Sequence, residues 1–127
     1  WLLNVSSVAS FQPAPRLAVY AATKAYVTSL TESLHEEAKP HGVHVTALCP
    51  GLTKTEFQRV SNADRYSDQF PSIAWTSPLQ VAETGLRDVV ANKAVSIPGA
   101  QYKVMSALTN SLPRSVRRLV SSRVQRG

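Results

Sequence analysis

Tyr20 and Lys24 are the residues of this sequence whose types and spacing first suggest chemistry. They lie in RLAVYAATKAYVTSLTESLHEEAKP, residues 16–40, a stretch with a helical pattern. Four positions make about one helical turn, so both side chains emerge on nearly the same face. An ammonium that close favours the phenolate, and a phenol tuned in this way can give a proton to a carbonyl or take one from an alcohol. A bare Tyr-x-x-x-Lys is also common in helices where tyrosine caps a core and lysine is solvated, so the neighbouring segments must decide.

Two serines follow the apolar run WLLNV, which we interpret as a buried strand. Ligands of open α/β sheets bind at the carboxyl ends of the strands, where the Ser7 hydroxyl could hold a substrate oxygen beside the phenol. Ser6 could serve instead, but adjacent strand positions face opposite sides, so we expect only one of the two to do so. The other explanation of Ser7 is a turn serine that satisfies backbone groups.

Pro50 and Gly51 follow a second predicted strand, VHVTALC, and should therefore lie at the same edge of the sheet as Ser7. Glycine lets a backbone pass close to a bound ring, and proline fixes the bend. Thr55, in the same loop, could hydrogen-bond an amide. An ordinary strand-to-helix turn could use the same residues.

The elements that must position these residues alternate along the chain. The helix is predicted over residues 18–39 and ends at Pro40 and Gly42. Its apolar stripe is formed by Tyr26, Leu30, Leu34 and Ala38, with Val27 beside them.

Three further elements are predicted in the second half of the chain. Ser77 and Pro78 begin a helix that runs to about Asn92, AVSIP is a candidate third strand, and two short helices interrupted at Pro113 follow Gly99. The order strand, helix, strand, helices, strand predicts a parallel sheet with helical crossovers, a three-layer α/β/α architecture.

Composition limits the remaining possibilities. The 127-residue sequence opens with WLLNVSS, its only methionine is Met105, and three strands make a thin sheet, so we expect a piece of a longer chain. No apolar run approaches the ~20 residues of a membrane span, and a cytoplasmic location is expected. One cysteine, Cys49, excludes an internal disulfide and suggests a buried small residue. His41 and His44, three apart in a turn and strand, do not suggest a metal site.

The combination of these motifs resembles the short-chain dehydrogenase/reductase family in its classical form. The likeness lies in NVSSVAS…YAATKAYVTSLTESLHEE…GVHVTALCPGLTKTEF, over roughly residues 1–58, whereas residues 59–127 fit the variable C-terminal region of the family only loosely. The resemblance implies a Rossmann-like doubly wound parallel sheet, here without its N-terminal βα units, of which residues 1–127 would be the C-terminal catalytic half. It also implies an oxidoreductase that interconverts an alcohol and a ketone or aldehyde by hydride transfer with NAD or NADP, NADP being favoured.

Site roles follow from the resemblance, residue by residue. Tyr20 would be the general acid/base, and Lys24 would make it more acidic while bonding the nicotinamide ribose. Ser7 would orient the substrate oxygen. Three residues, Pro50, Gly51 and Thr55, would sit against the nicotinamide.

The glycine-rich phosphate turn of the family, the residue that chooses NAD or NADP and the relay asparagine are not found among these residues. We therefore expect the 127-residue chain alone to bind dinucleotide poorly. The alternative is a truncated, inactive reductase that serves as a dimerisation or binding module, or a non-functional gene product; family members pair through the helix predicted over residues 18–39.

Two variable regions remain. Residues 57–77 are expected to form a substrate lid, with aromatics that favour a medium-sized, partly apolar substrate. Residues 101–127 form a basic helical tail: Lys103 and five arginines carry the net charge of +6, because eight basic and eight acidic residues cancel in residues 1–100. The tail could be a terminal helix with a solvated basic face, could dock on a partner, or could contact an anionic membrane. Nucleic-acid binding is not expected, because no aromatics interleave the arginines.

Overall fold

A computed structural model of the protein describes residues 1–55 and 70–124. The part of the predicted lid between residues 57 and 69 lies outside the described residues. The elements in chain order are β1 (Leu2–Val5), the 3₁₀ helix η1 (Val8–Phe11), α1 (Ala18–Ala38), η2 (Lys39–His41), β2 (Val45–Leu48), η3 (Ser72–Ala74), α4 (Pro78–Val90), β3 (Val95–Ser96), α5 (Ala100–Ser111) and α6 (Arg114–Val124).

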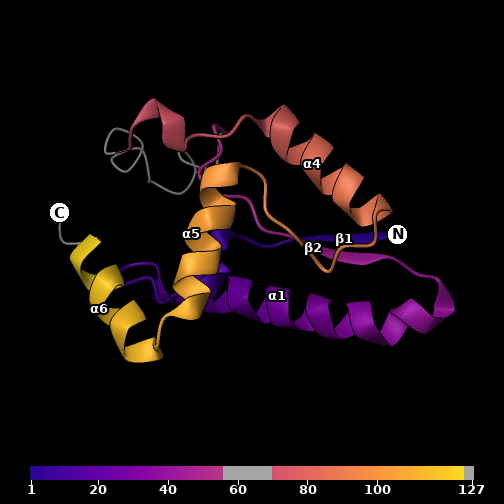
Figure 1. The fold of residues 1–127 in the computed structure, drawn as a ribbon, viewed down its shortest axis with the longest axis horizontal. Coiled ribbons are helices and arrows are strands. Elements are labelled where there is room, and N and C mark those ends of the chain that lie inside the picture. Colours follow the sequence, from indigo (N-terminus) through magenta and orange to yellow (C-terminus); the bar gives the residue numbers. More distant parts are fainter. Residues whose placement is uncertain (56–69, 125–127) are drawn as a thin grey trace.

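The three strands form one parallel sheet in the order β1-β2-β3, with Leu2 opposite Val45 and Ala47 opposite Val95. Helix α1 covers one face of the sheet and α4 the other (Figure 1). The central strand β2 is buried along its whole length, as expected for a strand paired on both edges and covered on both faces. The predicted α/β/α architecture is therefore confirmed.

Helix α1 packs on the sheet through small hydroxyl and histidine side chains rather than through its apolar stripe. Thr28, Thr31 and His35 are buried, and the His35 ring donates to the Val45 carbonyl at 2.7 Å. Tyr26, from the stripe, is 68% exposed. Small side chains bring the helix close to β2, and each polar group finds a partner there. Of the predicted stripe, Tyr26 and Leu30 are exposed, whereas Val27, Leu34 and Ala38 are partly buried.

The ends of α4 follow the predicted signals. Ser77 caps the helix by accepting from the Gln80 N–H at 3.1 Å, and Pro78 occupies the first turn. At the other end Asn92 adopts a left-handed conformation with φ 54°, and its N–H donates to the Val89 carbonyl. The Lys93 N–H donates to the Asp88 carbonyl, which completes a Schellman turn.

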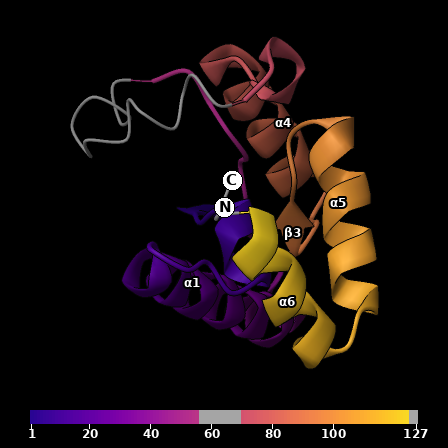
Figure 2. The same cartoon turned by 90° about the vertical axis from the view of Figure 1, so that its left-hand side faces the viewer.

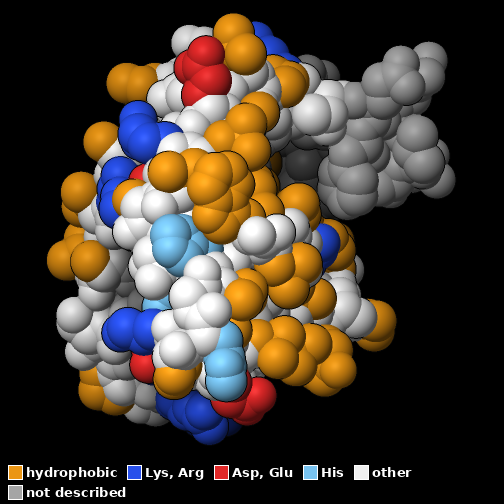
Figure 3. Space-filling model, turned by 90° about the vertical axis from the view of Figure 1, so that its right-hand side faces the viewer, with side chains coloured by type: hydrophobic (Ala, Val, Ile, Leu, Met, Phe, Trp, Pro, Cys, Tyr) orange, Lys and Arg blue, Asp and Glu red, His pale blue; other side chains and the backbone are white. Residues whose placement is uncertain are grey.

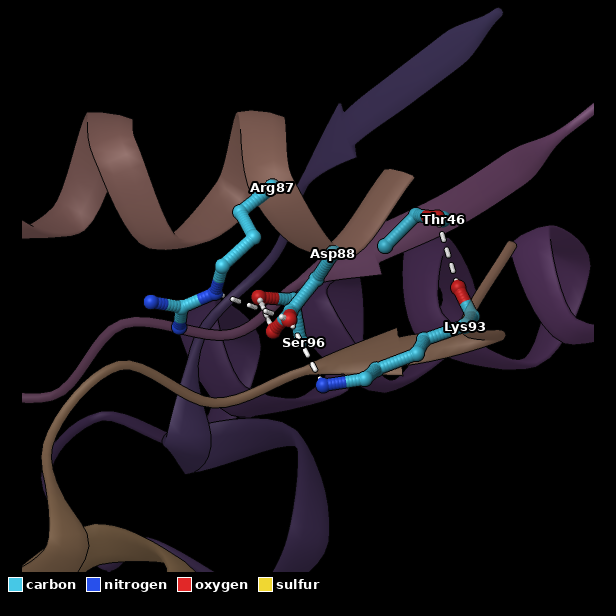
Figure 4. A network of polar contacts seen from close by, with 5 residues as sticks. All are labelled: Thr46, Arg87, Asp88, Lys93 and Ser96. Atoms are coloured by element: carbon cyan, nitrogen blue, oxygen red, sulfur yellow. Dashed lines mark hydrogen bonds and ion pairs between the residues drawn. The ribbon is translucent and has the colours of Figure 1, made fainter. Parts of the chain in front are cut away.

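A buried carboxylate joins this turn to the sheet. Asp88 accepts from Lys93 Nζ and from Ser96 Oγ, each at 2.7 Å, and Thr46 Oγ1 donates to the Lys93 carbonyl at 2.6 Å (Figure 4). Burial opposes the charge of Asp88, but these hydrogen bonds and the cations of Lys93 and Arg87 outweigh it and hold the pKa of the carboxyl below its ordinary value. One side chain thereby connects α4 with β3.

Helices α5 and α6 lie together beyond the carboxyl ends of the strands (Figures 1 and 2). Arg117 of α6 donates to the Phe11 carbonyl of η1 at 3.3 Å, and Ser121 is buried. Three apolar side chains of α6 are exposed instead, namely Val116, Leu119 and Val120. The terminal helix with a solvated basic face, the partner contact and the membrane contact therefore all stay predictions for this tail. Among the described helices, none combines the length and hydropathy that a membrane crossing requires.

Candidate active site

Ser6 and Ser7 follow β1 and face different surroundings. The Ser6 hydroxyl donates to the Lys24 carbonyl at 2.9 Å and lies 2.7 Å from Thr28 Oγ1, so it is a buried link between β1 and α1. The Ser7 hydroxyl accepts from the Ala9 N–H at 3.1 Å and caps η1. A hydroxyl that accepts one bond keeps its own proton to donate, so the cap leaves Ser7 able to hold a substrate oxygen.

Lys24 lies between β1 and the ring of Tyr20. Its Nζ donates to the Val5 carbonyl, the last of β1, at 3.1 Å, and lies 5.8 Å from the centroid of the Tyr20 ring. The Ser6 hydroxyl donates to the Lys24 carbonyl, so Lys24 is held both at its backbone and at its Nζ. An ammonium has three N–H donors, and a bond to one carbonyl leaves others for a ligand.

Tyr20 lies in the first turn of α1, next to a hollow of about 350 Å³ lined by residues 16–20. The segment before it bends sharply, with Arg16 at φ 67°. The side chain of Tyr20 is half-buried. The structure thus places a phenol near a cation on the first turn of the helix that covers the sheet.

The loops after β1 and β2 lie side by side. The Ser6 N–H donates to the Leu48 carbonyl at 2.7 Å, and the Val8 N–H donates to the Pro50 carbonyl at 3.0 Å. The segments that carry Ser7 and Pro50 therefore share one edge of the sheet. Thr55 is exposed at the end of the described loop.

Gly51 contacts a protein side chain that the sequence did not indicate. A Cβ built at this position would lie 2.1 Å from Cζ of Tyr102, a buried residue of α5. The Tyr102 hydroxyl accepts from the Leu52 N–H at 2.9 Å and donates to the Ala74 carbonyl at 2.6 Å. Because its partners are 50 and 28 residues away, no local pattern could have revealed this contact.

Cys49 and His44 have surroundings that indicate structural roles. Cys49 is completely buried, and burial raises the pKa of its thiol, while hydrogen bonds from Thr28 and neighbouring serines offset this only in part. A buried thiol of this kind is a poor nucleophile. The rings of His44 and Trp1 are stacked, with 6.4 Å between their centroids, and His44 Nδ1 lies 3.0 Å from the Val89 carbonyl oxygen.

Parallel strands with helices on both faces and polar residues at the carboxyl ends define the class of Rossmann-like α/β proteins. A family model described as short chain dehydrogenase matches residues 2–66, and the chain belongs to this family. The match covers β1, α1, β2 and the loop with Pro50 and Gly51.

Relatives and solved structures agree with this assignment. A very-long-chain 3-oxoacyl-CoA reductase of Bos taurus is 32% identical over 107 residues, 80% of this chain and 34% of that protein. The protein of the same name from Mus musculus is 39% identical over 59 residues, 46% of this chain and 19% of that one. A short-chain dehydrogenase from Sphingobium yanoikuyae in complex with NADPH matches with a TM-score of 0.66 and 25% identity over 88% of this chain and 45% of its own. The chain thus spans less than half the length of these proteins.

Proposed function

We propose that this chain carries the proton-transfer half of an NAD(P)-dependent oxidoreductase that interconverts an alcohol and a ketone or aldehyde. The observation that carries the proposal is the anchoring of Lys24 between the end of β1 and the Tyr20 ring, at a distance of 5.8 Å. The family of the chain and the NADPH in the Sphingobium yanoikuyae structure support it. The proposal covers both dinucleotides, because solved structures of the same fold hold NADP in some cases and NAD in others.

The residues present suit a nicotinamide cofactor. The Lys24 ammonium keeps donors beyond the one used on Val5, which suits ribose hydroxyls, and exposed Thr55 offers a hydroxyl beside the Pro50–Gly51 turn. When bound, the cofactor supplies or accepts the hydride. Ser7 orients the substrate oxygen, and Tyr20 gives it a proton or removes one.

The test removes one hydroxyl from α1 in the complete gene product. Tyr20→Phe should lower turnover by at least ~10²-fold, because general acid–base catalysis typically contributes a factor of this size. The affinity for the dinucleotide should stay within a few-fold of wild type. Tyr26→Phe, the same change at an exposed tyrosine of the same helix, is the matched control. Turnover is followed by the absorbance of the reduced nicotinamide with a panel of ketones, alcohols and 3-oxoacyl thioesters, the last chosen from the names of the relatives. Near-wild-type turnover by Tyr20→Phe would exclude the assigned role.

The alternative is a module that has the fold without the chemistry. We infer that the exposed side chains of α1, which include Val19, Tyr26 and Leu30, form a homo-oligomer interface in either case. Turnover by the complete gene product separates the two hypotheses, because only the enzyme would show it.

The 127-residue chain alone is proposed to be inactive. It contains no glycine-rich phosphate turn, so the pyrophosphate of a dinucleotide would have no backbone cradle within these residues. Calorimetric titration of this chain with NAD and with NADP should show no micromolar binding. Micromolar binding of either would contradict the proposal. A cytoplasmic location of the protein is a further proposal, which cell fractionation tests.

A second role is favoured by the exposed face of α6. Val116, Leu119 and Val120 face solvent on a helix rich in arginine, a combination that suits an anionic lipid surface. Co-sedimentation with phosphatidylserine vesicles tests this role: Leu119→Ser with Val120→Ser should reduce pelleting of the complete gene product. Equal pelleting of the wild type and the double variant would contradict the membrane role and favour a protein partner for this face of α6.

A further inference from the structure

Tyr102 joins two loops that flank the segment between residues 56 and 69. Its side chain is only 7% exposed, and its hydroxyl uses both hydrogen-bonding capacities on backbone groups, Leu52 N–H before the segment and Ala74 C=O after it. A tyrosine buried in this way is held at both its ring and its hydroxyl.

Backbone hydrogen bonds also join the two loops that Tyr102 contacts. Thr53 and Thr76 form a parallel bridge, in which the Thr76 N–H donates to the Leu52 carbonyl at 2.8 Å and the Lys54 N–H donates to the Thr76 carbonyl at 3.4 Å. Leu52 therefore bonds to Tyr102 through its N–H and to Thr76 through its carbonyl. Both backbone groups of this residue are fixed by segments that are distant in sequence.

The ring of Tyr102 dictates the residue at position 51. The nearest three ring atoms would lie 2.1 to 2.3 Å from any Cβ there, distances that van der Waals contact does not allow. The ring is buried and its hydroxyl is bonded at two sides, so it cannot move aside without losing those bonds. Gly51 is thus required by the protein itself, whatever ligand lies on the other side of the loop.

We propose that Tyr102 is a positioning residue that sets the conformation of the Pro50–Thr55 loop for dinucleotide binding. This inference deepens the proposed function and rests on it for its ligand. Burial raises the pKa of the Tyr102 phenol, offset in part by the Leu52 N–H, so the hydroxyl keeps its proton for the Ala74 carbonyl through the neutral range.

The first experiment removes the Tyr102 hydroxyl alone. In the complete gene product, Tyr102→Phe should speed hydrogen exchange of the Leu52 amide by about tenfold and raise KM for the dinucleotide by a similar factor, as expected for one lost hydrogen bond. The kcat should stay within about twofold, because loss of ground-state positioning alters binding rather than proton transfer. Tyr26→Phe serves as the control. An unchanged Leu52 exchange rate, or an unchanged KM, would overturn the proposal.

The second experiment asks whether Gly51 and Tyr102 are coupled. Gly51→Ala should lower the thermal unfolding midpoint strongly in the wild-type background and little in the Tyr102→Ala background, where space for the Cβ exists. Equal losses in both backgrounds would show that the ring does not dictate position 51. If Tyr102→Ala does not fold, the Tyr102→Phe exchange rate decides.

The unfolding and exchange measurements need no ligand, so they separate this inference from the proposed function. A wild-type protein without turnover would contradict the proposed function, and dinucleotide affinity measured by calorimetry would then replace KM. Wild-type turnover with no effect of Tyr102→Phe on either readout would contradict the positioning role alone.

Discussion

The adjacent residues Ser6 and Ser7 have different hydrogen-bond partners, from which we expect different roles. Ser6 is bonded to the backbone of Lys24 and lies against Thr28, whereas Ser7 accepts a single bond from the Ala9 N–H. Alternation along an extended chain directs one hydroxyl under α1 and the other toward the loop edge. We therefore expect Ser6 to stabilise the fold and Ser7 to act on the substrate.

Alanine at each serine tests this division. Ser6→Ala should cost about 1–3 kcal/mol of unfolding free energy, because Thr28 loses a buried partner, and should leave kcat nearly unchanged. Ser7→Ala should cost less than about 1 kcal/mol, the value of a lost cap, and should lower kcat at least ~10-fold. Urea denaturation and steady-state kinetics measure the two quantities. The reverse pattern would assign the substrate contact to Ser6.

Spacing predicted that Tyr20 and Lys24 lie close together and that two loops share one edge of the sheet, but not the contacts that hold these groups. The Tyr-x-x-x-Lys pair and the loop edge shared by Ser7 and Pro50 follow from helical and strand periodicity. The bond from Lys24 Nζ to Val5 depends on how closely α1 packs on the sheet, which periodicity does not give. Tyr102 had no sequence signal, since its partners come from two remote loops. The catalytic roles themselves stay predictions.

At the scale of elements, strand and helix positions were predictable because their end signals are local. Ser77 with Pro78 begins α4, and Gly42 with φ 70° ends the segment after α1. The buried face of α1 was not predictable in the same way. Threonines and a histidine face the sheet because each finds a partner there, as Thr31 does in the Asn4 amide at 3.1 Å. Such pairing depends on tertiary structure.

The turn after α4 favours a residue that tolerates positive φ. Asn92 lies at φ 54°, and its buried Oδ1 has no partner among the contacts of the described residues. Asn92→Gly should therefore be at least as stable as wild type, and Asn92→Val should cost about 1–2 kcal/mol. Chemical denaturation measures both. Asn110→Gly, the same change in the last turn of helix α5, should instead destabilise by roughly a few tenths of a kcal/mol, because glycine has a lower helix propensity than asparagine. A loss from Asn92→Gly as large as that from Asn110→Gly would contradict this account.

The Asp88 network should make stability depend on pH on the acid side. The pKa of the Asp88 carboxyl in the folded state lies below its ordinary value of 3.8. The stabilisation that the carboxylate gives is therefore complete above pH ~4 and is lost as the pH falls from there through the folded-state pKa. Asp88→Asn should cost roughly 1–3 kcal/mol at neutral pH and should flatten the dependence below pH ~4. Urea denaturation between pH ~2.5 and ~7 measures this. Glu83→Gln, at an exposed acid of the same helix, is the control. Equal acid slopes for Asp88→Asn and wild type would show that the carboxylate is not a stabilising group.

At the scale of the whole molecule, much apolar surface is exposed. Hydrophobic side chains gather beside the histidines on the face that carries the amino terminus (Figure 3). Trp1, Leu2 and Val5 are exposed along β1, which pairs only with β2 among the described strands. A strand with a free edge and exposed apolar residues offers a pairing surface to a further strand, either from the missing βα units or from another chain. Where another chain supplies the contact, stability and assembly are linked.

Helix α1 offers the sharpest test of that link. Val19 is 79% and Tyr26 68% exposed on a helix whose opposite face is fixed to the sheet by Thr28, Thr31 and His35. We expect Tyr26→Glu to shift the complete gene product toward monomer, because a charge buried in an apolar interface loses its hydration without a partner. Analytical ultracentrifugation measures the shift.

The matched control places the same kind of charge on another apolar side chain. Leu108→Glu, on the exposed face of α5, should leave the assembly state unchanged, because α5 lies at the carboxyl end of the sheet and not on the face that α1 presents. An equal shift by both variants would indicate general destabilisation, and a shift by Leu108→Glu alone would move the interface to α5. Because Tyr26 lies in the same helix as Tyr20 and Lys24, pairing through α1 would also place the proposed proton-transfer residues on an element fixed from both sides.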